Sequence, residues 1–362
     1  MRVFVYEALS AGAIPDPSPA GSLRAEGRAM LSAILEDFSR IPQVETVTTL
    51  QARSVSEGIS GFPRLRFGLV KCEITELGFA EEPYLFRTLA AQADFTLVIA
   101  PETEGLLCQR CRWVEECGGK LLGPSSEVIR LTSDKFELAG LLRNRGILTP
   151  PCVVAEIDAK VTYPAVMKPR DGAGSQATVL VRSSADIKRS LSQARAEGWT
   201  GELILQPFIP GQACSVSFLI GDAHVRALLT ASQTISDDGR FRYQGGCIPL
   251  AAPLAARATR LAARAVQAIP GLYGYVGVDL VLGSAEDGSQ DHVIEINPRL
   301  TTSYVGLRAL AKSNLAEAMI QAACGQEFGP LEWNEGSVRF WPDGRIHRPI
   351  GERGAKAPRE TH

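Results

Sequence analysis

The fold of this 362-residue chain is decided by the stretch YPAVMKPRDGAGSQA, residues 163–177. The apolar residues before Lys168 predict a strand, and a loop with two glycines follows that strand. Glycines allow consecutive backbone N–H groups to point at one anion, as they do in loops that bind phosphate. We therefore expect a phosphate-binding loop between two strands, and the alternative is a plain hairpin turn.

The same loop resembles two other nucleotide-binding patterns only in part. Its residues GAGSQA match the dinucleotide pattern GxGxxG/A, in which a helix must begin inside the motif. The residues that follow are TVLVR, at 178–182, and these are typical of an apolar strand. The chain also contains no GxxxxGK[ST] motif, which excludes an ordinary P-loop. A loop that joins two strands is the better interpretation.

Acidic residues lie inside two apolar strands further along the chain. Asp279 is within YVGVDLVL at 275–282, and VIEIN at 293–297 holds Glu295 and Asn297 on one face of a strand. A buried carboxylate without a partner is costly. Magnesium would neutralise these groups, because it binds carboxylate, amide and phosphate oxygens together with water. The alternative is that the two acids form structural ion pairs with Lys or Arg, and we favour the metal.

The first third of the chain alternates strand-like and helix-like segments, which predicts a parallel sheet covered by helices. Ligands bind beyond the carboxyl ends of the strands in such sheets, and Glu7 and Glu102 follow two of these ends. The predicted strands are 2–9, 44–50, 69–75, 95–100 and 120–123. The predicted helices are 22–40, 83–93 and 108–117.

The pattern changes after Thr149-Pro150-Pro151 to an α+β arrangement with hairpins. Ser133 or Asp134 is the expected N-cap of the helix that precedes this point. The segment YQGG at 243–246 has the composition of a turn. The predicted helices are 133–146, 185–197, 253–269 and 305–324. The predicted strands are 153–156, 164–168, 178–182, 203–208, 215–220, 225–231, 274–282 and 292–297. The polar tail at 351–362 is expected to be disordered.

Length and composition limit the class of protein. A chain of 362 residues predicts two or three domains. With 38 basic and 40 acidic residues, the net charge of −2 argues against a general nucleic-acid binder. No apolar run approaches the roughly 20 residues that span a bilayer, and the first residues do not resemble a signal peptide. We therefore expect a cytoplasmic protein with no membrane or nucleic-acid partner.

The eight cysteines are not expected to form a disulfide framework, which belongs to short secreted domains. Cys108 and Cys111 form a CxxC motif, and Cys117 follows six residues later. No nearby His or Cys supplies the fourth ligand that a zinc site usually needs. We interpret these three thiols as small core or surface residues on a helix.

Taken together and in this order, the motifs resemble the ATP-grasp superfamily over nearly the whole chain. The resemblance implies an ATP-grasp fold with an N-terminal parallel-sheet (pre-ATP-grasp) domain. It divides the chain into residues 1–124, 125–208, 209–350 and the tail at 351–362. It further implies that ATP and two magnesium ions, for which manganese can substitute, bind between the second and third of these segments.

The resemblance also implies a role for individual residues. Arg299 would face the transferred phosphate and act in catalysis together with Lys168. The ATP-binding residues would be Lys135, Lys168, the loop residues Gly172, Ala173, Gly174 and Ser175, and the hinge residues Gln206, Pro207, Phe208 and Ile209. The metal ligands would be Asp279, Glu295 and Asn297. One departure is GQACS at 211–215, where Ala213 and Cys214 replace an acidic ribose contact that many members carry.

Several further segments are similar to the tyramine–L-glutamate ligases of methanofuran and methylofuran synthesis. These segments are YEAL, SLRAEGRAML, IAPETEG, PGQACSVS, YQGG and NPRLTTSYVGLRAL. The similarity implies an ATP-dependent ligase that joins the γ-carboxyl group of glutamate to the amine of tyramine through an acyl phosphate. Small molecules would be its partners, and a homodimer is possible because family members are often dimers. The expected substrate contacts are Glu7, Glu102, Thr302, Ser303 and Tyr304. The alternatives are a ligase for another amino acid or amine, and a non-catalytic ATP-binding module.

Overall fold

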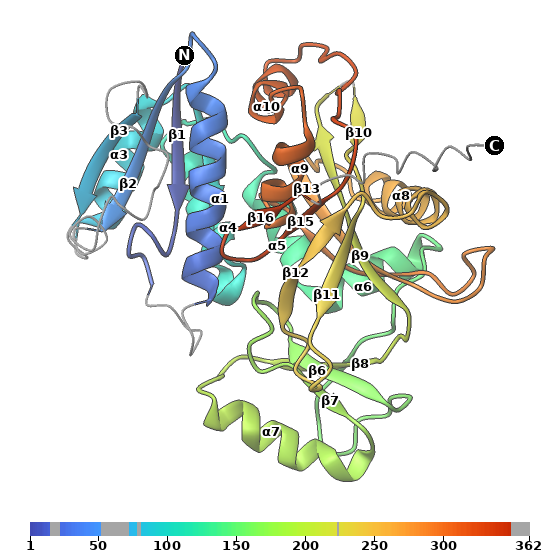
Figure 1. Cartoon of the computed structure of the whole chain (residues 1–362). Helices are drawn as coiled ribbons and strands as arrows, with labels where there is room; N and C mark the ends of the chain where they lie inside the picture. Colours follow the sequence, from blue (N-terminus) through green and yellow to red (C-terminus); the bar gives the residue numbers. More distant parts are fainter. Residues whose placement is uncertain (15–21, 52–71, 78–80, 223, 349–362) are drawn as a thin grey trace, which may run out of the picture.

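The computed structural model describes residues 1–14, 22–51, 72–77, 81–222 and 224–348. Within these residues the strands form three sheets, shown with the helices in Figure 1. The strands are β1 (Arg2–Glu7), β2 (Glu45–Gln51), β3 (Cys72–Leu77), β4 (Phe95–Ile99), β5 (Val153–Val154), β6 (Ala165–Pro169), β7 (Val179–Val181), β8 (Leu203–Pro207), β9 (Gln212–Ile220), β10 (Val225–Ala227), β11 (Ala231–Ile235), β12 (Tyr243–Ile248), β13 (Gly274–Leu282), β14 (His292–Asn297), β15 (Val338–Phe340) and β16 (Ile346–His347). The helices are α1 (Ser22–Ser39), α3 (Glu82–Gln92), α4 (Leu106–Glu116), α5 (Ser126–Ser133), α6 (Lys135–Asn144), α7 (Ile187–Ala196), α8 (Ala252–Gln267), α9 (Ser303–Leu310) and α10 (Leu315–Ala323), with short 3-10 helices at η2 (Thr103–Gly105) and η3 (Ser184–Asp186).

A four-stranded parallel sheet in the order β3-β2-β1-β4 forms the N-terminal unit, as the alternation of elements predicts. Along β1, Val3 and Val5 belong to the buried cluster that includes α1. Phe4 and Tyr6 belong instead to a cluster with α3 and α4 on the opposite face. Because β1 and β4 are parallel neighbours, the loops that follow them leave the same edge of the sheet.

The central unit is a small antiparallel sheet in the order β5-β8-β6-β7. Helix α7 packs against this sheet, and Figure 1 shows the unit standing apart below the other two. Its core is separate, with Met167 of β6 and Leu205 of β8 packed against Ile187 of α7.

The third unit is built on an eight-stranded sheet in the order β14-β13-β9-β11-β12-β15-β16, with β10 paired to β9. Helix α8 covers one face, where Val276 and Val278 of β13 are buried. Helices α9 and α10 cover the other face, where Tyr275 of β13 is buried. The alternation along β13 therefore places one core on each side of the sheet.

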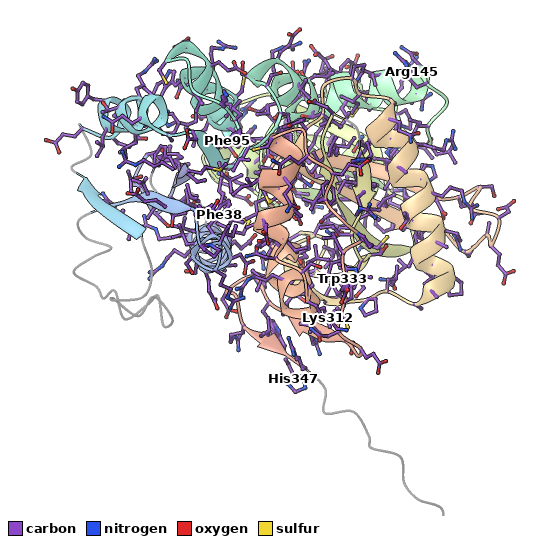
Figure 2. All side chains as sticks on the ribbon, turned by 90° about the horizontal axis from the view of Figure 1, so that it is seen from above. Phe38, Phe95, Arg145, Lys312, Trp333 and His347 are labelled. Atoms are coloured by element: carbon purple, nitrogen blue, oxygen red, sulfur yellow. The ribbon has the colours of Figure 1, made fainter. Side chains whose placement is uncertain are left out.

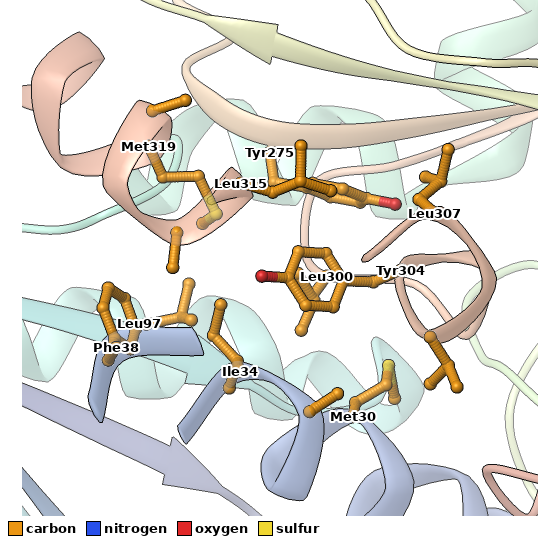
Figure 3. Close-up of a cluster of buried hydrophobic side chains, with 14 of the residues drawn as sticks. Met30, Ile34, Phe38, Leu97, Tyr275, Leu300, Tyr304, Leu307, Leu315 and Met319 are labelled. Atoms are coloured by element: carbon orange, nitrogen blue, oxygen red, sulfur yellow. The ribbon is translucent and has the colours of Figure 1, made fainter. Parts of the chain in front are cut away.

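Helix α1 joins the N-terminal and third units through one shared core (Figure 3). Met30, Ile34 and Phe38 of α1 lie in the same buried cluster as β1 and β4 on one side and α9 and α10 on the other. Phe38 and Phe95 of this cluster are labelled in Figure 2, where side chains fill the space between the two units. Since the cluster is continuous, the two units share buried apolar surface.

The helix predicted at 133–146 is confirmed as α6, because the Asp134 carboxylate accepts hydrogen bonds from the first amides of this helix. Asp134 is thus the N-cap, one of the two caps expected, and the preceding residues form a separate helix, α5, that ends at Ser133. The helix predicted at 305–324 is wrong in its extent, because Asn314 caps α10 and divides the predicted segment into α9 and α10.

The turn predicted at YQGG is also wrong, because these residues begin strand β12. A Cβ atom on Gly245 would lie 2.2 Å from the carbonyl oxygen of Phe340, and one on Gly246 would lie 2.1 Å from that of Ser232. The glycines are therefore required by the close approach of neighbouring strands. The strand predicted at 225–231 is two shorter strands, β10 and β11.

The tail at 351–362 and the first part of the strand predicted at 69–75 lie outside the described residues. The segment predicted as a strand at 120–123 contributes a single bridge between Leu121 and Thr96. Cys108 and Cys111 are buried on α4, as expected for small core residues. None of the helices in the described ranges combines the length and the apolar character that crossing a membrane requires.

Candidate active site

The acidic residues predicted from the two apolar strands meet on one face of the third unit. Asp279 of β13 lies opposite Glu295 of β14 in antiparallel register. The Asn297 amide donates a hydrogen bond of 3.0 Å to one Asp279 oxygen. Gln233 of β11 donates a hydrogen bond of 2.9 Å to the other. The three residues predicted from the sequence therefore lie together in the structure. Gln233 also belongs to this site, although the sequence did not suggest it.

The electrostatics of this pair favour a bound cation. Burial and the negative charge of Glu295 raise the pKa of Asp279 to about 8. Burial also acts to raise the pKa of Glu295, but the positive charges of Lys135 and Lys168 outweigh it and keep that pKa below its usual value. Two neighbouring half-buried carboxylates thus resist being ionised together unless a cation is nearby.

The three oxygen-bearing side chains are of the chemical type that magnesium prefers. Two carboxylates and the amide oxygen of Asn297 are hard oxygen donors, which Mg²⁺ prefers. In the described ranges, no three His, Cys, Asp or Glu side chains gather into a potential metal site. A metal at Asp279 and Glu295 would therefore need phosphate oxygens and water to complete its coordination, as is usual for magnesium that is bound with a nucleotide.

Two lysines lie beside the acidic pair. Lys135 opens α6, and its Nζ is 3.7 Å from a Glu295 oxygen and donates a hydrogen bond of 2.9 Å to the carbonyl of Gly172. Lys168 is buried in β6, and burial lowers its pKa although the charge of Glu295 acts in the opposite direction. Both positive charges therefore face the region where a polyphosphate chain would meet the acidic pair.

The loop at 172–175, which we predict to bind phosphate, contains three residues with positive φ. Gly172 and Gly174 have φ values of +132° and +73°, and Ser175 has a φ of +58° although it is not glycine. A non-glycine residue in this region is strained and is held there by surrounding contacts. Here the Ser175 hydroxyl donates a hydrogen bond of 2.7 Å to the carbonyl of Phe241. Ala173 lies between the two glycines, so residues 172–175 form one tightly curved segment.

The predicted hinge lies where β8 leaves the central sheet. The amide of Phe208 donates a hydrogen bond to the Pro164 carbonyl, and Pro207 is paired with Ala165 across the sheet. The Phe208 ring lies 5.9 Å from the ring of Phe241, measured between centroids. Gln206 and Ile209 flank this pair. The hinge is therefore attached to the central unit on one side and to the loop after β11 on the other.

A thiol that the sequence did not suggest lies between the hinge and the lysines. Cys152 hydrogen-bonds to the Lys135 carbonyl over 3.7 Å. Burial raises the pKa of its thiol to about 11, although Lys168 and Gln206 act to lower it. Cys152 is thus an uncharged wall of the site, since only the thiolate is a strong nucleophile.

Arg299 is bound by the N-terminal unit. Its guanidinium donates hydrogen bonds of 2.8 and 2.9 Å to the two oxygens of Glu102, which is 5% exposed. Burial acts to lower the pKa of Arg299, but the charge of Glu102 more than compensates, and Glu295 and Glu26 add to its effect. Two residues predicted separately, one for phosphate and one for substrate, therefore form a single ion pair.

The other predicted acid of the N-terminal unit has a local role. Glu7 is 1% exposed, and its two oxygens accept hydrogen bonds of 3.0 and 2.8 Å from the amides of Leu9 and Ser10. A Cβ atom on Gly27 would lie 2.5 Å from this carboxyl group, so α1 covers it closely. Glu7 therefore braces the loop after β1, and its contact with substrate stays a prediction.

Tyr304 joins α9 to α1. Its side chain is fully buried and points from α9 toward α1 (Figure 3). The hydroxyl donates a hydrogen bond of 2.7 Å to Asp37, and Arg308 binds both oxygens of the same carboxylate. These contacts give Tyr304 a structural role, and its contact with substrate stays a prediction.

Thr302 and Ser303 lie at the start of α9 among polar side chains. Thr302 donates a hydrogen bond of 3.2 Å to Glu26 of α1. The Ser303 hydroxyl is 2.8 Å from that of Thr301 and 3.3 Å from that of Tyr275. Glu26, which the sequence did not suggest, thus lies beside the segment that carries Arg299.

Comparison with known proteins agrees with this arrangement. Residues 132–303 match the ATP-grasp domain family, and residues 63–129 match the pre ATP-grasp 3 domain family. The tyramine–L-glutamate ligase from Methanocaldococcus fervens is 27% identical to the chain, and the match covers 83% of this chain and 88% of the relative. The tyramine–L-glutamate ligase from Methanocaldococcus jannaschii is 28% identical, and that match covers 83% of this chain and 84% of the relative. The crystal structure of an ATP-grasp superfamily protein from Archaeoglobus fulgidus has a TM-score of 0.66 and 25% identity, and the match covers 94% of this chain and 92% of that one. The chain therefore belongs to the ATP-grasp family, among the ATP-dependent ligases that form carbon–nitrogen bonds.

Proposed function

We propose that the protein joins the γ-carboxyl group of L-glutamate to the amine of tyramine through an acyl phosphate, in the synthesis of a methanofuran- or methylofuran-type cofactor. One observation carries the proposal: Lys135 and Lys168 lie beside the acidic pair Asp279–Glu295, and the Glu295 charge also acts on Arg299. The identity of the two substrates is taken from the names of the two relatives, which are tyramine–L-glutamate ligases.

The residues divide by the part of ATP that each would hold. Lys135, Lys168 and the loop at 172–175 would bind the phosphates, since they offer two cations and a curved run of backbone. The hinge at 206–209 would bind the adenine. ATP would then lie between the unit at 125–208 and the unit at 209–350, with residues 1–124 supplying contacts to substrate.

Asp279, Glu295 and Asn297 would hold two magnesium ions. Bound there, magnesium supplies charge neutralisation to the phosphate oxygens. The chain's own contribution is to keep the two carboxylates opposite each other on paired strands, with Gln233 and Asn297 fixing the Asp279 oxygens. Arg299 adds a guanidinium whose planar fork suits a phosphate or a carboxylate.

The proposed chemistry has two steps. In the first, a carboxylate oxygen of the acid bonds to the γ-phosphorus of ATP while the bond from that phosphorus to the bridging oxygen breaks, which releases ADP. In the second, the amine nitrogen bonds to the acyl carbon and the carbon–oxygen bond to phosphate breaks. The ammonium loses one proton before this attack and a second as the amide forms. The protein acts mainly by positioning and by charge stabilisation.

The amine would approach from the side of α1. Glu102 is already paired with Arg299, so its charge is largely neutralised. Glu26 accepts a hydrogen bond from Thr302. Its negative charge acts to raise the pKa of both Arg299 and Tyr243, so it lies close to both side chains. An ammonium group is favoured next to such a carboxylate, which can also accept a proton.

A matrix of candidate acids and amines tests the proposal, with ADP release as the readout and mass spectrometry to identify the amide. We expect ADP and amide in equal amounts with L-glutamate and tyramine, and little product with other pairs. The Lys168→Ala variant serves as the inactive control. A different preferred pair, or ADP release without an amide, would refute the substrate assignment.

A further inference from the structure

An open cavity of about 470 Å³ lies between α4, the junction of α5 and α6, and the loop after β6, and Glu102 is part of its wall. This volume is within the range of roughly 300–1,000 Å³ that is typical of small-molecule sites. Glu102 lines the cavity and also binds Arg299, so one side chain separates the cavity from the guanidinium.

Most charged side chains in the cavity wall are already paired. Arg170 donates hydrogen bonds to Asp134 and to Glu202, both of which line the cavity. Arg130 is 3.0 Å from Glu137. These groups hold the wall together, and their charges offset one another locally.

Two charged residues of the wall are left over. Within the part of the chain that the structure describes, no carboxylate oxygen lies within 4.0 Å of the Arg112 guanidinium, which donates a hydrogen bond to the Cys108 sulfur over 3.9 Å. In the same described ranges, Asp171 makes no hydrogen bond or ion pair through its carboxylate. One free cation and one free anion thus line the same cavity.

We propose that this cavity binds the head group of an α-amino acid substrate, with Asp171 holding the α-ammonium and Arg112 the α-carboxylate. A zwitterionic head group has the two charges that complement this wall, whereas a simple anion or cation would leave one wall charge unmatched. The side-chain carboxylate of the amino acid would then extend past Glu102 toward Arg299. The inference rests on the proposed ligase function and adds the site of its amino-acid substrate.

The position of Asp171 gives the site a second consequence. Asp171 directly precedes Gly172, whose carbonyl accepts the hydrogen bond from Lys135. An ammonium bound to Asp171 would therefore hold the beginning of the phosphate loop. Occupancy of the cavity would favour the conformation in which this loop covers the phosphates.

Analogues that lack one charge of the head group test the two contacts separately. Glutarate lacks the α-ammonium, and 4-aminobutyrate lacks the α-carboxylate. For Asp171→Asn, we expect the KM for L-glutamate to rise at least about tenfold while the KM for glutarate stays within about twofold. For Arg112→Gln, we expect the same rise for L-glutamate and no change for 4-aminobutyrate. Asp158→Asn and Arg143→Gln, which replace exposed residues outside the cavity, are the matched controls.

Direct titration of L-glutamate into the full-length wild type and variants, in the presence of a non-hydrolysable ATP analogue, separates this proposal from the function it rests on. If ADP release fails with every acid and amine but L-glutamate binds and both variants weaken its binding, the ligase function is refuted and the cavity assignment stands. If wild-type turnover is found but the variants bind L-glutamate normally, or lose glutarate and L-glutamate equally, the cavity assignment is overturned. Absence of binding to the wild type overturns it as well.

Discussion

The guanidinium of Arg299 and the carboxylate of Glu102 form a bidentate ion pair, although the two residues are 197 positions apart in the chain. The pair connects the end of β14 to the loop after β4, so it crosses from the third unit to the N-terminal unit. It also determines the direction of the guanidinium, since both hydrogen bonds are in the plane of its fork. The N-terminal unit thus orients the side chain that we assign to the transferred phosphate.

Replacing Glu102 by Gln should therefore affect turnover. One acceptor oxygen and the negative charge are lost, so Arg299 keeps at most one of its two hydrogen bonds. We expect kcat to fall by about tenfold or more, because small displacements of a positioned group are costly. The measurement is steady-state ADP release at saturating substrates. Glu116→Gln, which breaks the exposed pair with Arg87, is the control and should be unchanged. Wild-type kcat in E102Q would show that the pair does not position Arg299.

The acidic pair is tested by Asp279→Ala and Glu295→Ala. Each should lower kcat by at least about two orders of magnitude, as the removal of other electrostatic stabilisers does. The fold should survive in both, because removing one carboxylate relieves the repulsion between the two. Asp287→Ala, an exposed acid in the turn between the same strands, is the control. Calorimetric titration of magnesium in the presence of ADP supplies a readout that does not depend on turnover, and unchanged magnesium affinity in both variants would exclude these residues as ligands.

The phosphate loop should respond to nucleotide. The Lys135–Gly172 contact joins the loop to α6 and the Ser175–Phe241 contact joins it to the third unit, and a bound polyphosphate would add further hydrogen bonds. We expect amide exchange across residues 171–177 to slow when an ATP analogue is added, as in other closing loops. Strand β13, buried in both states, is the internal reference. Equally slow exchange with and without the analogue would identify a static hairpin.

Tyr304→Phe should reduce stability and leave catalysis intact. The variant loses the hydrogen bond to the buried Asp37 carboxylate, while Arg308 keeps its two. Hydrogen bonds to charged groups are among the stronger ones, so we expect the thermal midpoint to fall by roughly 2–4 °C. Tyr273→Phe, which removes a hydrogen bond to a neutral carbonyl, should cost less. A raised KM for glutamate with an unchanged thermal midpoint would show instead that Tyr304 contacts the substrate.

Glu26→Gln tests the side from which the amine approaches. The substitution keeps the acceptor for Thr302 and removes the charge. We expect the KM for tyramine to rise at least about tenfold, with the KM for ATP within about twofold, because the negative charge favours the bound ammonium. Glu36→Gln, on the same helix but further from the site, is the comparison. Equal amine kinetics in E26Q and wild type would exclude Glu26 as the ammonium contact.

The parts of the site that could be predicted are those with a local signal. Period-2 alternation was enough to place Glu295 and Asn297 on one face, and the isolated carboxylate in an apolar strand identified Asp279. Gln233 and Glu26 carry no such signal, since both are ordinary polar residues that reach the site only through strand pairing and helix packing. A local sequence pattern does not show which distant segments of the chain come into contact, so these two residues could not be predicted.

The misjudged elements have a related cause. Asn314 interrupts a segment whose apolar spacing continues as in a single helix, so the sequence pattern alone does not show that this residue caps α10. At Gly245 and Gly246 the residue type commonly marks a turn, whereas here it permits two strands to come unusually close. In each case packing in three dimensions overrides the local preference.

The core that α1 shares with α9 and α10 limits how such enzymes can be recombined. Transplanting the first 124 residues from a relative would set foreign side chains against Leu315 and Met319, in place of the matched Met30, Ile34 and Phe38. Such hybrids would expose or overfill an apolar seam and would tend to aggregate. New substrate preferences in this lineage are therefore expected to accumulate by single substitutions around Glu26 of α1 and in the loop that carries Glu102. The central unit, with its independent core, is the part that could be exchanged whole.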